Sequence, residues 1–577
     1  MIQRFRAAGC AAVTIMFLAG LTGCPTPAPP PDDGDGDDTP PVVCVPLSVT
    51  SFTTDSTLSA GCYTAESSIS VSGDATLTVE PGVTIKFQQG VEMTVWGDGK
   101  LSAVGTADLP VVLTGEEAIR GYWDGLRFYQ SNSTVNQLDY VTIEYAGAQW
   151  DANLYLAGSS NSPARVDITN CTLRESEAYG FVFTDAEIGE FSGNTITANA
   201  VGAGSVTAND AGYLDDTSTY AGNDVDIVRI SGSTLSEDRT WPGIDADYLI
   251  DGDIGVQALL TIAPGATLVF AQENEMTVWG DGRLSAVGTA VAPILFTGNE
   301  EIRGYWSGLR FYHSNSTNNQ LDYVTFEYGG GYFDANLYLD GASDSPARVN
   351  ITNCTFRESE TYGLSMEDAV VEQFSGNTLT ANTLGAVNTT AENAGYLDDT
   401  STYVGNDEDI VRIASGTIST AVTWSGIDGA YFIDGSIGVD ALLTLEPGAR
   451  LVFNQNEEMT VWSEGRLSAV GTADVPITFT GAETTSGYWR GLRFYHSNSD
   501  QNRLDYVTIE YGGGYWDGNL YLASTASEPA TVEVTNSSFT NSATYGIYID
   551  ADSTINDDVE TANTFANNAS GDVFWDD

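Results

Sequence analysis

The sequence predicts an all-β solenoid, in which short strands stack coil upon coil along one axis. Two observations carry this prediction. Short runs of apolar and β-branched residues alternate with polar residues and end at Gly, Asn, Asp or Pro. In addition, a unit of 183 residues occurs in two full tandem copies and a shortened third copy. Its clearest copies are EMTVWGDGKLSAVGTA from Glu92, EMTVWGDGRLSAVGTA from Glu275 and EMTVWSEGRLSAVGTA from Glu458. Repeats of this kind bury their apolar faces against their neighbours.

The strands expected within one unit are short. Examples are residues 77–79, 84–87, 141–145 and 181–183. After the first residues of the chain, no segment shows sustained helical periodicity. A β-sandwich would also contain short strands, but it does not readily explain the Asn-Cys-Thr and Gly-Asn-Thr corners that recur every few strands. Stacked coils explain them, because like residues then fall into ladders.

The repeat divides the chain into three tandem units. The first covers residues 44–226, the second 227–409, and a shortened third 410–577. The stretch YLDDTSTY occurs in the first two units, and the third ends before it. The segment VRISGSTLSEDRTWPGIDADYLIDGDIGV, which links the first two units, resembles segments that open such solenoids. From the sequence, one continuous stack and three shorter stacks end to end are both open.

The first residues predict export and lipidation. Two arginines precede an apolar run over residues 11–21, and the tetrapeptide Leu-Thr-Gly-Cys ends at Cys24. This pattern predicts a signal peptide over 1–23, because the apolar run is shorter than the roughly 20 residues of a spanning helix. The tetrapeptide resembles a bacterial lipobox, which implies a diacylglyceryl group on Cys24. Residues 24–43 then hold the lipidated cysteine and a Pro- and Asp-rich tether that cannot bury apolar surface.

We therefore expect a protein of the cell envelope, at the outer membrane or the cell surface, which contacts the membrane through the lipid on Cys24. The net charge is −58, with 79 acidic against 21 basic side chains. This charge argues against nucleic acid and anionic lipid surfaces as partners, because both would be repelled.

Four cysteines remain in the expected folded body. Cys44 and Cys62 flank its start in an oxidising compartment, and we expect a disulfide between them that pins the first coil. Cys171 and Cys354 share one repeat position, which Ser537 occupies in the third unit. We interpret these two as small interior residues, not as a disulfide pair.

The motifs of one unit resemble those of a known family. In order they read ATLTVEPGVTIKF, KLSAVGTADLPVVLTG, YWDGLRF, LDYVTIEYAG, RVDITNCTLRES, YGFVF and GNTITAN. This series is similar to the right-handed parallel β-helix repeat proteins of the pectate-lyase-like superfold, over most of residues 65–577. The resemblance implies that fold, and it implies enzymes that cleave polysaccharides among the relatives, but a fold does not fix a function.

Candidate catalytic residues do not stand out. Glycoside hydrolysis uses two carboxylates at a set separation, and lyases of this shape resemble one another in using acidic calcium ligands with an Arg or Lys. The Gly-His-Gly signature of galacturonase-like enzymes is absent. The two histidines, His313 and His496, share a repeat position that holds Gln130 in the first unit. We interpret them as coil-surface residues.

Paired aspartates recur only in the first two units, as Asp215-Asp216 and Asp398-Asp399. They predict turns or calcium-binding loops, because Asp readily shapes loops. We assign no catalytic residue and no metal ligand. We expect no cofactor, since no specific motif supports calcium.

Repeated tryptophans offer the better candidate site. Trp123, Trp306 and Trp489 recur with the repeat, and a row of them would stack on sugar rings and gain avidity. The alternative is that they close the core. Uniform copies favour a structural, adhesive or multivalent binding role toward a polysaccharide or another surface protein. They favour such a role over catalysis and leave enzymatic activity open. The alternative function is a polysaccharide lyase or glycoside hydrolase.

Overall fold

The computed structural model describes residues 43–525 and 527–576. The predicted signal peptide, Cys24 and nearly all of the tether lie outside these residues. Within them, no helix has the length and apolar character needed to cross a membrane. Residues 44–577 make one compact unit.

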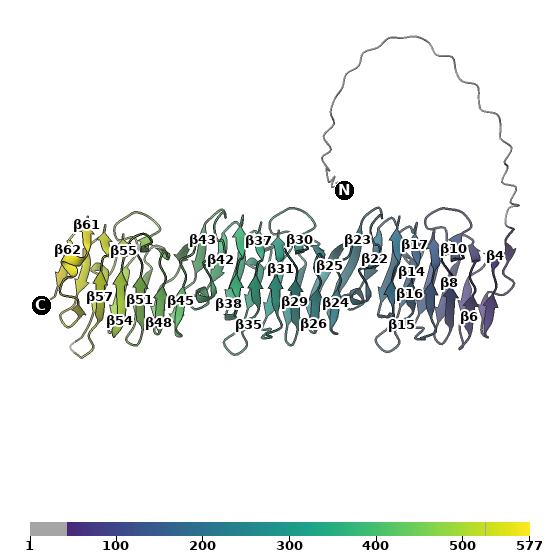
Figure 1. The fold of residues 1–577 in the computed structure, drawn as a ribbon, viewed down its shortest axis with the longest axis horizontal. Helices are drawn as coiled ribbons and strands as arrows, with labels where there is room; N and C mark the ends of the chain where they lie inside the picture. Colours follow the sequence, from purple (N-terminus) through teal and green to yellow (C-terminus); the bar gives the residue numbers. More distant parts are fainter. Residues whose placement is uncertain (1–42, 526, 577) are drawn as a thin grey trace, which may run out of the picture. The chain divides into compact units, whose positions relative to one another are not determined.

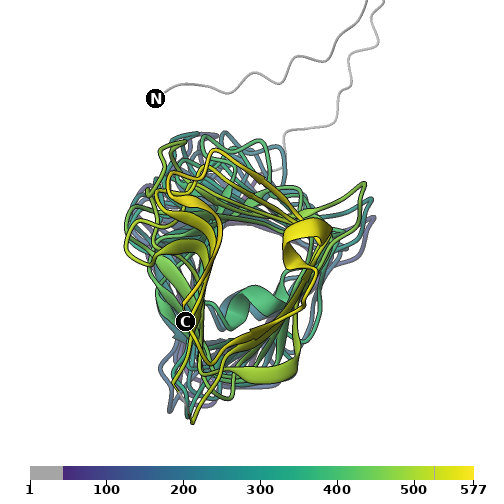
Figure 2. The ribbon, with the colours of Figure 1, turned by 90° about the vertical axis from the view of Figure 1, so that its left-hand side faces the viewer.

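This unit is a parallel β-helix, and the right-handed form predicted from the sequence fits it (Figures 1 and 2). All pairings between its named strands are parallel. Three ladders form the sides of the first unit's coils. One ladder includes β4 (Gly61–Ala65), β7 (Val83–Phe87), β10 (Val111–Gly115) and β13 (Val141–Glu144). The second includes β8 (Glu92–Trp96), β11 (Gly125–Tyr129), β14 (Ala152–Ala157) and β18 (Tyr179–Thr184). The third includes β6 (Thr76–Val79), β9 (Lys100–Val104), β12 (Gln137–Asp139) and β16 (Asp167–Thr169).

Later units repeat the strands that matter for the site. In the second unit they are β28 (Glu275–Trp279), β29 (Arg283–Val287), β31 (Gly308–Tyr312) and β34 (Ala335–Asp340). In the third they are β50 (Glu458–Val461), β51 (Arg466–Val470), β53 (Gly491–Tyr495), β54 (Asn498–Asp505) and β56 (Gly518–Ala523). Helical elements of the described residues are short, namely the 3-10 turns η1 (Asp210–Tyr213) and η2 (Asn393–Tyr396) and the helix α1 (Val559–Ala562).

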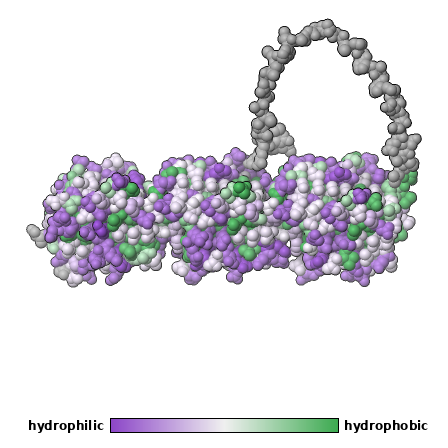
Figure 3. Space-filling view, viewed as in Figure 1, coloured by the Kyte–Doolittle hydropathy of each residue, from purple (hydrophilic) through white to green (hydrophobic). Residues whose placement is uncertain are grey.

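The core lies inside the coils, because alternate strand residues point inward. In β7, Val83, Ile85 and Phe87 are fully buried, while the two residues between them are half-buried. Apolar residues stack in register from coil to coil, as Leu126 does on Leu154. On the face that Figure 3 shows, hydrophilic residues predominate and hydrophobic ones are scattered. Such a surface fits an apolar core that is enclosed by its own coils.

The stack is continuous across the unit boundaries. At the first boundary β22 (Gly202–Val206) pairs with β23 (Ile227–Leu235), which pairs with β25 (Asp247–Val256). The first half of β25 pairs with β27 (Thr267–Phe270), and its second half pairs with β28. At the second boundary the ladder runs through β42 (Gly385–Thr389), β43 (Ile410–Ile413), β46 (Ala430–Ile433) and β49 (Arg450–Phe453). The three units therefore form one continuous stack of coils, and not three separate stacks.

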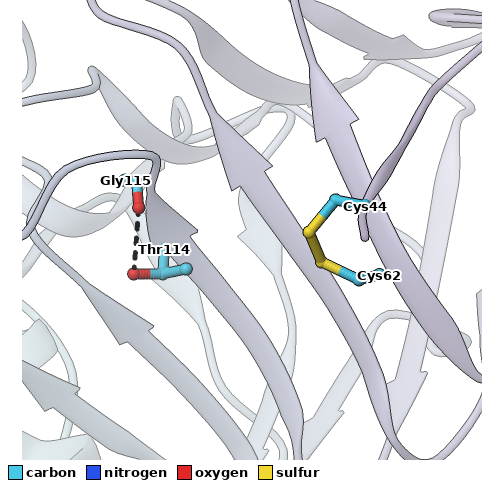
Figure 4. The surroundings of a disulfide bond; sticks show 4 residues. All are labelled: Cys44, Cys62, Thr114 and Gly115. Carbon is cyan, nitrogen blue, oxygen red and sulfur yellow. Dashed lines mark hydrogen bonds between the residues drawn. A yellow bond between two sulfur atoms is a disulfide. The ribbon is translucent and has the colours of Figure 1, made fainter. Parts of the chain in front are cut away.

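The first coil carries the disulfide. Cys44 and Cys62, the pair expected to bond, are joined where β1 (Val45–Pro46) pairs with β4 (Figure 4). Cys171 and Cys354 are free and buried, and burial raises the pKa of both thiols to about 12. They are interior residues with little thiolate character.

Candidate binding grooves on the outer face

The tryptophans singled out from the sequence are core residues. Trp123, Trp306 and Trp489 expose no surface. Each ring stacks on a buried phenylalanine, at centroid distances of 4.0, 4.2 and 4.2 Å, and each Nε1 donates to a backbone carbonyl of the next coil. The prediction that they stack on a ligand is wrong, because a ring without exposed surface cannot meet a sugar. The alternative, that they close the core, is correct.

A different set of aromatic residues faces the solvent. Trp96, Trp279 and Trp462 are 49%, 40% and 40% exposed. Each stands beside a tyrosine of the next coil: Trp96 pairs with Tyr129 and Trp279 with Tyr312 in the ladders, and the rings of Trp462 and Tyr495 lie 5.3 Å apart. We call each Trp–Tyr pair, with the arginine next to it, an aromatic platform. The described residues contain three such platforms.

The arginine of each platform lies between two rings. The Arg127 guanidinium is 4.4 Å from the Tyr129 centroid and 4.1 Å from that of Trp150. In the third unit Arg493 lies 4.1 Å from Tyr495 and 4.0 Å from Trp516. In the second unit Arg310 has the corresponding contacts with Tyr312 at 4.2 Å and Phe333 at 5.4 Å. These cation–π contacts hold the platform side chains in place.

A polar groove opens directly beside the platform. In the third unit it is an open depression of about 810 Å³, and in the second one of about 710 Å³. The two are lined by equivalent residues 183 positions apart, which include Asp281 and Glu464, Arg283 and Arg466, His313 and His496, and Asn315 and Asn498. The first unit carries Asp98, Lys100, Gln130 and Asn132 at these positions.

A buried hydrogen-bond network underlies the grooves of the second and third units, and the same network occurs at the equivalent place in the first unit. In the first unit the Asn136 amide donates to Ser131 Oγ at 2.8 Å and its Oδ1 accepts from the Leu101 N–H at 2.9 Å. The Ser131 hydroxyl donates to the Gly99 carbonyl at 2.7 Å. A Cβ on Gly99 would clash with the Val71 carbonyl, so the turn requires glycine. The same bonds recur at 2.7–3.0 Å with Ser314, Asn319 and Gly282, and with Ser497, Asn502 and Gly465.

The histidines join the platform to the groove. His313 and His496 have φ of 52° and 61°, as Gln130 does at 51°, which turns the chain out of the strand. The His313 ring lies 4.3 Å from that of Tyr312, and the His496 ring stacks on Tyr495 at 3.9 Å. Both histidines lie on the outer surface of the coils, as expected. They also line the grooves, which was not predicted from the sequence.

The paired aspartates shape turns. Asp215 Oδ2 accepts from the Thr217 N–H at 3.0 Å, and Asp398 Oδ2 accepts from the Thr400 N–H at 3.1 Å. These are the local bonds of Asx turns. In the described parts of the chain, no group of three or more His, Cys, Asp or Glu side chains has a geometry that could hold a metal ion.

One carboxyl group near the first platform has a perturbed pKa. Burial, with the nearby Glu92 carboxylate, raises the pKa of Asp124. Glu92 itself accepts a hydrogen bond from Trp150 Nε1 at 3.0 Å. The position of Asp124 holds Ser307 in the second unit and Arg490 in the third. This carboxylate pair is therefore unique to the first unit.

Comparison with known proteins agrees with the fold. A family model described as a pectate-lyase-like beta helix domain matches residues 50–150. The match includes β8 and β11, and hence the first aromatic platform, and ends inside the first unit. No curated protein matches the sequence.

Proposed function

We propose that this parallel β-helix is a lipid-anchored protein of the cell envelope that binds a neutral polysaccharide at several grooves at once. The observation that carries the proposal is the repetition of one platform and one groove floor in all three units. The β-helix fold alone does not require this repetition, because the exposed Trp96 at the end of β8 does not contribute to the core.

The chemistry of the grooves supports a sugar ligand. The apolar C–H face of a pyranose ring packs on an exposed aromatic ring, while its hydroxyl groups need both donors and acceptors nearby. Each platform supplies the ring, and each groove supplies carboxylate, amide and cationic side chains. The grooves are open to solvent, which suits a polymer more than an enclosed small molecule. A net charge of −58 disfavours polyanionic glycans.

Repetition supports multivalent binding. When one of three sites on a chain binds a polymer, the other two meet it at a high effective concentration, so that the overall affinity exceeds that of any single site. The expected lipid on Cys24 would add further copies on one surface. A Cys24→Ser variant should move from the membrane fraction to the soluble fraction of cells, and its retention in the membrane fraction would contradict the anchor.

The binding proposal is tested with the three exposed tryptophans. We expect the triple variant Trp96→Ala, Trp279→Ala, Trp462→Ala to lose binding to neutral polysaccharides on a glycan array, with an unchanged melting temperature. As a control, Tyr332→Ala and Trp575→Ala remove exposed aromatic residues outside the platforms, and binding should persist. Equal binding by the triple variant and the parent protein would overturn the proposal.

A second candidate function, a glycoside hydrolase, is favoured by the Asp124 and Glu92 pair alone. A carboxyl group with a raised pKa beside a second carboxyl group is the arrangement of a general acid and its partner. The pair occurs once, as a catalytic centre requires. If the parent protein releases reducing ends from a polysaccharide and Asp124→Asn does not, the result would support hydrolysis. If the parent protein releases no reducing ends from any polysaccharide that it binds, hydrolysis of those ligands would be excluded.

A further inference from the structure

The grooves of the second and third units and the equivalent place in the first unit differ in their surface side chains, although the hydrogen-bond network beneath them is the same. The same groove position holds Lys100, Arg283 and Arg466. In the first unit Lys100 forms an ion pair with Asp74, and in the second Arg283 Nη2 lies 3.1 Å from Asp238 Oδ1. In the third, Arg466 Nη1 donates to Gln501 Oε1 at 3.1 Å, and no ion pair is found for it among the described residues.

The loss of that partner has a simple origin in the sequence. Asp238 corresponds to Ala421 in the third unit. Both positions are exposed, so the substitution leaves the core untouched. In the second unit Asp238 also accepts from the Leu259 N–H at 2.8 Å, which fixes its carboxylate toward Arg283. In the second unit, Arg283 uses an N–H donor of its guanidinium for the contact with Asp238. The equivalent donor of Arg466 has no carboxylate partner among the described residues and can bind a ligand.

The third groove also gains an acceptor. Ser345 of the second groove corresponds to Glu528 in the third, and both line their grooves. Glu528 Oε2 lies 2.8 Å from His496 Nδ1, and the His496 ring is stacked on Tyr495. The contact fixes one carboxylate oxygen and leaves the other to accept a further hydrogen bond. The acceptor is thus held in place before a ligand arrives.

We propose that the third groove is the dominant sugar site of the chain, and that it selects a neutral pyranose with two adjacent hydroxyl groups. This inference rests on the proposed glycan-binding function. Arg466 donates to one hydroxyl oxygen, Glu528 accepts from the neighbouring hydroxyl, and the ring lies toward the Trp462 and Tyr495 platform. Charge-assisted hydrogen bonds of this kind are about twice as strong as neutral ones, and preorganisation lowers the entropic cost of binding.

The reciprocal exchange of one residue tests the inference. The full chain would be titrated by calorimetry with three neutral hexasaccharides: cellohexaose, maltohexaose and β-1,4-mannohexaose. We expect one tight site and two weaker ones. Ala421→Asp should weaken the tight site by roughly tenfold, because it restores the carboxylate that occupies Arg283 in the second unit. Asp238→Ala should strengthen the second groove, so that two tight sites appear.

Controls separate this inference from the proposed function. Ala421→Asn adds volume without charge at the same exposed position, and it should leave the tight site unchanged. Melting temperatures of all variants check the fold. If the parent binds none of the hexasaccharides and no glycan of the array, the proposed function and the inference both fail. If the parent binds and Ala421→Asp binds equally well, the dominant third groove is overturned while the proposed function stands.

Discussion

The second and third units share their buried hydrogen bonds but differ in their surface ion pairs. Ser314 and Asn319 bond at 2.8 Å, as Ser497 and Asn502 do. On the surface of the second unit, Arg303 Nε lies 2.9 Å from Glu358 and its Nη1 lies 2.7 Å from Asp407, which ties several coils together. The third unit has Ser486 and Asn541 in place of Arg303 and Glu358. Buried polar groups are costly to leave unpaired, whereas exposed ion pairs contribute little, so the surface is where copies diverge.

The largest effect should come from the shared core. Trp306→Ala and Trp489→Ala each remove a fully buried ring stacked on a phenylalanine. We expect each to lower the free energy of unfolding by about 3–5 kcal/mol. Urea denaturation, with hydrogen exchange of the surrounding coils, would measure it. Trp279→Ala is the control, because this exposed ring should cost less than about 0.5 kcal/mol. Similar losses for Trp279 and Trp306 would contradict the distinction between platform and core.

The same distinction shows what the sequence could predict. Repeated alternation of apolar and polar residues is a direct consequence of coils that bury one side of every strand, so the fold was predictable. The exposed Trp96 was also predictable in principle: it lies two residues after Thr94, on the face opposite to Met93 and Val95. Trp123 gives no such signal, because it precedes β11 in a loop where strand alternation does not apply.

The grooves themselves could not be predicted from local patterns. Their walls come from three successive coils: in the third unit the turn before β51, the segment after β53 and the loop after β56 line one groove. Spacings between these segments vary with loop length, so no fixed motif marks the site. Ion pairs such as Arg283 with Asp238, 45 residues earlier, need the coil register, which only the structure supplies.

Equal losses of stability are expected when the hydrogen-bond network beneath the groove is broken in the second and in the third unit. Asn319→Ala and Asn502→Ala each leave a buried backbone N–H without a partner. Each also removes a hydrogen bond to a buried serine hydroxyl, which still donates to a glycine carbonyl. We expect each to cost about 1–3 kcal/mol, with the same value in both units within error. Local hydrogen exchange of β29 and β51 would measure the cost unit by unit. A clear inequality would show that the two floors are not equivalent, and would weaken the argument that one groove is built three times.

A smaller effect should follow from making the third platform like the second. Trp516 Nε1 donates to Glu458 Oε2 at 2.9 Å, whereas the second unit has Phe333 at that position. Trp516→Phe should cost about 0.5–1.5 kcal/mol, the contribution of one hydrogen bond. Glu458 keeps the contact with Arg490 at 3.2 Å, so its charge stays compensated. Thermal unfolding would detect the loss, and an unchanged or higher stability would show that this bond does not support the platform.

The smallest effect should come from removing the Arg303 ion pairs. In Arg303→Ser, which copies the third unit, the lost contacts involve side chains that are 30–55% exposed. We expect a cost of about 0.2–1 kcal/mol at low salt, because solvent screens such pairs, and no measurable cost near 1 M salt. Ser486→Arg should bring no gain by itself, since Asn541 offers the guanidinium no charge; the double variant Ser486→Arg, Asn541→Glu should gain a few tenths of a kcal/mol. A loss in Arg303→Ser that persists at high salt would mean that the arginine packs between coils, and that the third unit lacks a structural contact and not only a charge.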